Sequence, residues 1–108
     1  MTLKQGDIVW CDFAPSSGRE SIKRRPAFVL SRKMFNDHTG FAVVAPITST
    51  LRDVALEVNL PEGISTKGTI LVHQLKSLDL SSRQVKYIEH APDDIIQKVK
   101  EIAKLIIS

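Results

Sequence analysis

The sequence is poor in the residues that build metal and cofactor sites. Its 108 residues include one cysteine, Cys11, and 3 histidines that stand far apart. No CxxC, HxxxH or HExxH pair occurs, so the sequence predicts no metal site. The 5 glycines form neither GxxxxGK[ST] nor GxGxxG, which excludes the familiar nucleotide-binding loops. We therefore expect a protein that works without a cofactor.

Long apolar runs are also missing. The first ten residues, MTLKQGDIVW, lack the apolar centre of a signal peptide, and no run approaches the roughly 18 residues that span a bilayer. A single cysteine cannot form an internal disulfide, which suits a reducing compartment. These absences predict a cytoplasmic protein with no membrane partner, and the length fits one domain, residues 1–108.

The positive charge of the chain is concentrated in one stretch of the sequence, residues 19–33. The formal net charge is +3, but six basic residues fall between positions 19 and 33 against one nearby carboxylate, Glu20. Such a run predicts a surface for an anion, either nucleic acid or an acidic protein, while a solvated loop explains the individual charges equally well. The six are Arg19, Lys23, Arg24, Arg25, Arg32 and Lys33.

Alternating and β-branched patterns predict six short strands. They are expected at residues 8–13, 26–31, 41–46, 55–60, 68–72 and 83–89. A short turn or helix at 33–36 and a loop at 37–40 join the second strand to the third. Strands of this length and spacing indicate a mainly β fold with helices, built as a small barrel.

The C-terminal tail, APDDIIQKVKEIAKLIIS, changes to a helical period. Pro92 suits the start of a helix, and the carboxylates of Asp93 and Asp94 complement its positive end. We expect this helix to pack on the barrel through one apolar face. The centre of that face is formed by Ile95, Val99, Ile102 and Ile106.

Two polar clusters stand where apolar strands begin or end. Arg25 directly precedes Pro26 and the second strand, and Thr48-Ser49-Thr50 follows the third. If those strands are neighbours, a guanidinium and a hydroxyl converge on one phosphate, the first as a charged fork and the second as a neutral donor. Arg-Pro and Thr-Ser pairs are common at strand ends, so a solvated rim is the competing interpretation.

Five motifs in order resemble one known family. GDIVWCDFAPSSGRE, RRPAFVLS, FNDHTG, VVAPITST and HQLKSLDL, over residues 6 to about 80, are similar to the MazF/PemK toxins of bacterial toxin-antitoxin pairs. The resemblance implies an SH3-like small barrel with a C-terminal helix, the MazF/PemK/CcdB type of fold. It also implies a homodimer, and an antitoxin partner whose C-terminal segment covers the RNA groove.

The activity that the resemblance implies is sequence-specific cleavage of single-stranded RNA without a metal. The 2′-hydroxyl attacks the adjacent phosphate and leaves a 2′,3′-cyclic phosphate and a 5′-hydroxyl. The family's catalytic pair falls on Arg25, which would stabilise charge on the phosphate oxygens, and on Thr48, which would hold the phosphate or donate to it. Glu20 matches a loop carboxylate that either accepts a proton or tethers Arg25 or a base.

Further residues are expected to contact RNA, each with an alternative. Gln74 reads a base or braces the groove, and His73 transfers a proton or simply packs at a strand end. One subgroup of the family uses a different catalytic set, but its places hold Arg19, Leu71 and His73 here, so that set does not transfer. The predicted RNA-binding residues are Phe13, Arg19, Lys23, Arg24, Ser49, His73 and Gln74.

Two aromatic residues of the first strand, Trp10 and Phe13, are three positions apart and therefore lie on opposite faces. One is expected in the core, and Phe13, which is nearer the basic loop, is the predicted base-stacking residue.

Two other functions fit the same fold. Gyrase poisons rely on an aromatic residue near the C-terminus, whereas this chain ends LIIS. A non-catalytic SH3-like module that binds RNA or protein needs only the basic loop. Such a module would keep its binding after Arg25→Ala and would cut nothing.

Overall fold

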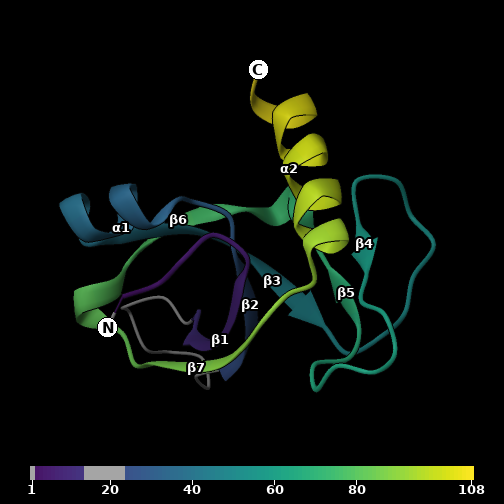
Figure 1. The fold of residues 1–108 in the computed structure, drawn as a ribbon, viewed down its shortest axis with the longest axis horizontal. Helices are drawn as coiled ribbons and strands as arrows, with labels where there is room; N and C mark the ends of the chain where they lie inside the picture. The colour runs from purple at the N-terminus through teal and green to yellow at the C-terminus, as the bar shows by residue number, and fades with distance from the viewer. Residues whose placement is uncertain (1, 14–23) are drawn as a thin grey trace.

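A curved antiparallel sheet with two helices makes up the part of the chain that the computed structural model describes, residues 2–13 and 24–108. Figure 1 shows α1 and β6 on one side of α2, and β4 and β5 on the other. The strands are β1 Asp7–Asp12, β2 Arg24–Val29, β3 Phe41–Thr48, β4 Val58–Asn59, β5 Thr69–Ile70, β6 Lys76–Asp79 and β7 Val85–His90. The helices are α1 Lys33–Thr39 and α2 Asp93–Ile107, with single 3-10 turns η1 Val72–Gln74 and η2 Leu80–Ser82.

The long strand β3 organises the sheet. The strand order is β4-β5-β3-β2-β1-β7, and β6 pairs with the first half of β3 while β5 pairs with its last two residues. The edge strands β4 and β7 do not pair with each other among the described residues, so the sheet curls without closing. The predicted mainly β fold with helices is confirmed, and the predicted barrel is an open one.

Each face of the sheet has its own core because side chains alternate along every strand. One core lies beneath α2 and joins Ile8 and Phe28 to Ile95 and Val99. The other lies within the curl of the sheet and includes Val9, Ala27, Val44 and Leu78. The predicted C-terminal helix is therefore confirmed, and its apolar face packs on the sheet.

The middle of the chain forms less strand than its alternation predicts. Residues 55–60 give only the two-residue β4, since Leu56 has a positive φ of 70° that breaks the extended backbone. The apolar run 68–72 gives only β5, after which the chain turns into η1. By contrast, β6 was missed, because its sequence KSLD carries one buried apolar residue, Leu78.

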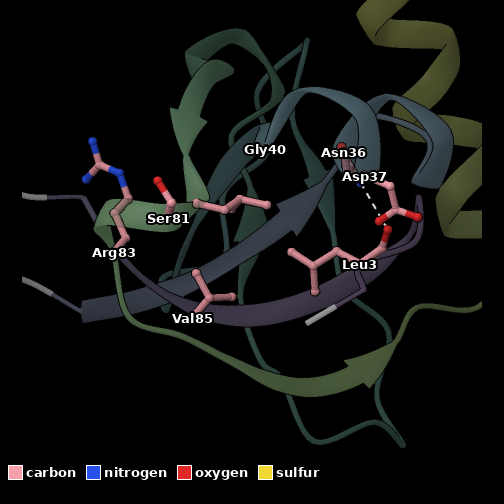
Figure 2. A pocket seen from close by; sticks show the side chains of 8 residues that line it. Leu3, Asn36, Asp37, Gly40, Ser81, Arg83 and Val85 are labelled. Atoms are coloured by element: carbon pink, nitrogen blue, oxygen red, sulfur yellow. Dashed lines mark hydrogen bonds between the residues drawn. The ribbon is translucent and has the colours of Figure 1, made fainter.

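The short turn or helix predicted at 33–36 is the start of a helix, which continues through the predicted loop to Thr39. Gly40, in the left-handed region at φ 75°, ends α1 and donates its N–H to the carbonyl of Asn36. The buried amide of Asn36 also donates to the carbonyl of Leu3, at 3.0 Å, and so ties α1 to the start of the chain (Figure 2). No helix in the described ranges is long and apolar enough to cross a membrane.

Candidate functional site

Arg25 and Thr48 lie on neighbouring strands. Strand β2 pairs with β3 in an antiparallel register that includes Val29 with Val44 and ends at Ala27 with Pro46. Continuing this register by two residues places Arg25 opposite Thr48. The ladder ends early because Pro26 and Pro46 lack an N–H to donate.

The side chains of Arg25 and Thr48 share one face of the sheet. Ala27 and Val44 belong to the core within the curl, and Arg25 and Thr48 follow them at even spacing along β2 and β3. Both residues are half-buried, so they lie at the mouth of this core. The arrangement can present a permanent cation and a hydroxyl to one bound phosphate.

The turn after Thr48 is held by hydrogen bonds. The N–H of Thr50 points at Oγ1 of Thr48 across 3.5 Å, a long contact, and the carbonyl of Thr50 accepts from the Thr69 hydroxyl at 3.0 Å. Because the Thr48 oxygen already faces a donor, its own proton is the part of the hydroxyl left to donate to a ligand.

The segment after Thr50 contains a buried carboxylate that binds an arginine of the same segment. Glu57, with a side chain 1% exposed, accepts two hydrogen bonds from the Arg52 guanidinium, both at 2.9 Å. His73 Nδ1 lies 3.7 Å from the same carboxylate, too far for a hydrogen bond. His73 is thus placed beside the 48–57 segment rather than packed in the core, and both it and Gln74 are exposed on η1.

The other predicted residues are distributed around this site. Arg24 is exposed and pairs across the ladder with Asp12, and Ser49 is exposed directly after Thr48. The leucine before η1 donates its N–H to the carbonyl of Pro46, which brings η1 against the end of β3. Arg19, Glu20 and Lys23 lie outside the described residues, so their roles stay predictions.

The two aromatic residues, Trp10 and Phe13, differ in exposure. They lie on opposite faces as predicted, but Trp10 is the exposed one, at 39%, while Phe13 is half-buried against the core within the curl. The ammonium of Lys76 lies 5.7 Å from the centre of the Phe13 ring. Trp10 is open because α2 covers its face of the sheet only further along.

Sequence reasoning missed a groove of about 490 Å³ beside Trp10. Its lining comes from the four strands β1, β2, β3 and β7 and from the segment 65–67. Glu89 of β7 holds that segment by accepting from the N–H groups of Ser65 and Thr66, at 3.1 and 2.7 Å, and from the Thr66 hydroxyl. The groove is lined by Trp10, Pro26, Ile47, Ser49, Ser65, Thr66, Lys67 and Ile88.

The Glu89 carboxyl is held ionised by these bonds. Burial acts to raise its pKa, but the donors of Thr66 and Ser65 outweigh burial, and the pKa lies below its ordinary value. At neutral pH the Glu89 carboxylate is therefore ionised and accepts these hydrogen bonds from the segment 65–67.

A second hollow, of about 400 Å³, lies between α1, η2 and the start of β7 (Figure 2). Asn36 and Asp37 border it at one end and Ser81 and Arg83 at the other, over Leu3 and Val85. It contains none of the predicted site residues and so is separate from the Arg25 and Thr48 site.

The remaining candidate groups are the metal-ligating side chains and the single thiol of the described residues. Within residues 2–13 and 24–108, no three His, Cys, Asp or Glu side chains gather closely enough to hold a metal ion. Cys11 is buried opposite Arg25, and burial raises the pKa of its thiol. The thiol is therefore protonated at neutral pH and is a poor nucleophile.

Comparison with known proteins identifies the family. Residues 4–107 match the model of the PemK-like, MazF-like toxins of type II toxin-antitoxin systems. The chain belongs to this toxin family. Among curated members, the endoribonuclease toxin MazF of Escherichia coli K12 is 38% identical over 78 residues, which cover 72% of this chain and 69% of MazF. The endoribonuclease toxin ChpB of the same organism is 36% identical over 102 residues, covering 89% of this chain and 86% of ChpB.

Solved structures of the toxin family agree with the fold. The MazE-MazF crystal structure from Deinococcus radiodurans contains a chain 34% identical to this one, with a TM-score of 0.88 and coverage of 100% of this chain and 99% of that one. The open, curled sheet with its C-terminal helix is thus the fold of a MazF-like toxin.

Proposed function

We propose that this chain is a toxin with endoribonuclease activity that cuts single-stranded RNA at a short recognition sequence without a metal ion. The attacking group is the 2′-hydroxyl next to the cleaved bond, and the products carry a 2′,3′-cyclic phosphate and a 5′-hydroxyl. The observation that supports this most is the register of β2 and β3, which puts Arg25 and Thr48 on one face at the end of a MazF-like sheet.

Arg25 is suited to stabilise the transition state. Attack by the 2′-oxygen concentrates negative charge on the non-bridging phosphate oxygens, and a guanidinium offers two parallel N–H donors to them. Because a guanidinium stays protonated, Arg25 does not act as the base that removes the 2′-proton.

Thr48 supplies a neutral donor to the same phosphate. With the N–H of Thr50 facing its oxygen, the Thr48 hydroxyl donates outward and holds the phosphate in line for attack. Glu20, whose carboxylate follows from the family pattern, either accepts the proton of the 2′-hydroxyl or tethers Arg25 or a base. The RNA chain is held by Arg24, Ser49, His73 and Gln74, together with Phe13, Arg19 and Lys23.

A cognate antitoxin is the proposed protein partner. Its C-terminal segment would cover the RNA groove and so compete with RNA for Arg25 and the basic residues around it. This is supported by the likeness of the chain to the toxin in a MazE-MazF structure.

The proposed assembly is a homodimer. Large apolar side chains stay exposed on α1 and on the last turns of α2, with Met34 at 73%, Leu105 at 75% and Ile107 at 71%. Surfaces of this kind are usually covered by a partner. Light scattering should give a mass of twice the 12.0 kDa of one chain. The measured mass should fall towards that of one chain in the double variant Met34→Asp, Leu105→Asp, and should stay unchanged in the control Leu51→Asp, whose side chain is also exposed.

The test of the activity is RNA cleavage in excess EDTA. The wild-type protein, Arg25→Ala, Thr48→Ala and the control Lys98→Ala are incubated with a long, weakly structured RNA, and the new ends are mapped. We expect cuts at one short sequence with cyclic phosphate ends, about 100-fold slower or more in Arg25→Ala and unchanged in Lys98→Ala. Absence of cutting by the folded wild-type protein on varied RNAs would contradict the proposal.

A further inference from the structure

Thr69 is a hydroxyl residue inside an otherwise apolar strand. It is 0% exposed and lies in β5, between the strands β3 and β4. A buried hydroxyl is stabilising only when its hydrogen bonds are made. The partners of Thr69 therefore show what the residue is for.

Those partners all come from the segment that follows Thr48. Oγ1 of Thr69 lies 3.0 Å from the carbonyl oxygen of Thr50, 3.2 Å from the backbone nitrogen of Arg52 and 2.6 Å from the side-chain amide of Asn59. The hydroxyl proton faces two acceptors, the Thr50 carbonyl and the side-chain oxygen of Asn59, and the hydroxyl oxygen accepts from the N–H of Arg52. One side chain thus fixes both ends of the segment 50–59.

Thr69 also stands beside Thr48 itself. The two residues are paired directly across β3 and β5, and Asn59 is paired with Thr69 from the other side. The carbonyl of Thr50 accepts from Thr69 while the N–H of the same Thr50 faces the Thr48 hydroxyl. The backbone of Thr50 therefore connects the two hydroxyls: its N–H faces Thr48 and its carbonyl accepts from Thr69.

Gly68, the residue before Thr69, packs its backbone closely against Thr48. Gly68 has a φ of 121°, and a Cβ placed on it would lie 1.8 Å from the carbonyl oxygen of Thr48. The backbone of β5 therefore packs directly against Thr48. Within the segment 50–59, the buried Glu57 accepts from the Arg52 guanidinium, and Thr69 accepts from the Arg52 backbone N–H. Arg52 is therefore held at both its backbone and its side chain.

We propose that Thr69 is a positioning residue for cleavage, which acts by holding the Thr48 hydroxyl in the direction that donates to the scissile phosphate. This rests on the proposed function. Thr69 does not touch RNA, so its hydroxyl affects the rate of the chemical step and leaves RNA affinity nearly unchanged. Small displacements of a positioning group are costly because attack must be in line.

The experiment compares Thr69→Val, which keeps the shape and removes the hydroxyl, with Thr69→Ser, which keeps the hydroxyl. Single-turnover cleavage at saturating RNA should be about 10- to 100-fold slower in Thr69→Val and within about threefold of wild type in Thr69→Ser. RNA affinity, measured with both changes placed in Arg25→Ala, should differ by less than about twofold. The Arg52 N–H should lose its protection from hydrogen exchange in Thr69→Val alone.

The outcomes separate this inference from the function on which it rests. A wild-type protein that cuts no RNA overturns the proposed endoribonuclease activity, and the catalytic role of Thr69 falls with it. A wild-type protein that cuts, together with a folded Thr69→Val that cuts equally fast, overturns the role of Thr69 alone. Equal losses in Thr69→Val and Thr69→Ser also overturn it, because the hydroxyl would then not be the cause.

Discussion

Two segments beside the candidate site are each fastened by one residue of a neighbouring strand, but by different chemistry. The segment 50–59 is held by the neutral hydroxyl of Thr69, which is fully buried. The segment 65–67 is held by the carboxylate of Glu89, which is half-buried and ionised. The first arrangement is insensitive to pH and the second depends on a charge, so only the second weakens in acid.

The largest effect should come from the backbone beneath the Thr69 arrangement. In Gly68→Ala, the new Cβ meets the Thr48 carbonyl at a positive φ, so we expect a loss of about 3 kcal/mol in the free energy of unfolding. Gly63→Ala is the matched control, since Gly63 also has a positive φ, 96°, but nothing lies within 4 Å of its Cβ. Urea denaturation measures both, and equal losses would show that strain rather than contact with Thr48 matters.

Removing the Thr69 hydroxyl should have a smaller effect on stability. Thr69→Val leaves the carbonyl of Thr50 and the N–H of Arg52 without a partner, so we expect a loss of about 2 kcal/mol. The loss should be the same at pH 8 and at pH 5 because no titrating group is involved. A loss that varies strongly with pH between these values would contradict the comparison.

The stability that Glu89 contributes should depend on pH, unlike that of Thr69. Glu89→Gln should lose about 1 kcal/mol at pH 7, because a carboxylate accepts the Ser65 and Thr66 donors better than an amide does. The pKa of Glu89 is lowered by folding, so its contribution is present above the unfolded value, roughly 4.3, and is lost as the pH falls through the folded pKa. The thermal unfolding temperatures of the two proteins should therefore converge as the pH falls below the folded pKa of Glu89, with Glu62→Gln as the exposed control.

The smallest effect should come from an ion pair on the surface. Lys33 and Asp37, four residues apart on α1, are joined at 2.9 Å with side chains 54% and 39% exposed. Asp37→Asn should cost only about 0.3 kcal/mol, and the difference should vanish in 1 M salt. If Asp37→Asn loses as much unfolding free energy as Glu89→Gln, the difference in burial between the two carboxylates has no effect on stability.

The sequence predicted the parts of the fold that follow a simple period. The apolar stripe of α2 and the β-branched run of β1 each match one regular structure, so their positions were predicted well. Residues 55–60 alternate like a strand, yet the positive φ of Leu56 and the tertiary contacts of Glu57 limit that strand to two residues. Local alternation carries no information about such contacts.

The candidate site was predicted through the position of its residues along two strands, and its supporting contacts were not. Arg25 and Thr48 each stand at a strand end, which is visible in the sequence. Thr69 could have been noticed as the hydroxyl in GTILV, but its partners Thr50 and Asn59 lie 19 and 10 residues away and are known only from the fold. The exposure of Trp10 depends on where α2 stops covering the sheet.

The exposed indole of Trp10 has a spectroscopic consequence. It is the only tryptophan in the chain, it is 39% exposed, and it lines the groove next to Pro26 and Ser49. Light that excites only tryptophan therefore reports on a single indole, in a groove whose lining residues Pro26 and Ser49 directly follow Arg25 and Thr48 in the chain. Any molecule that settles in the groove displaces water from the indole, and its arrival can be followed in real time in the unlabelled protein.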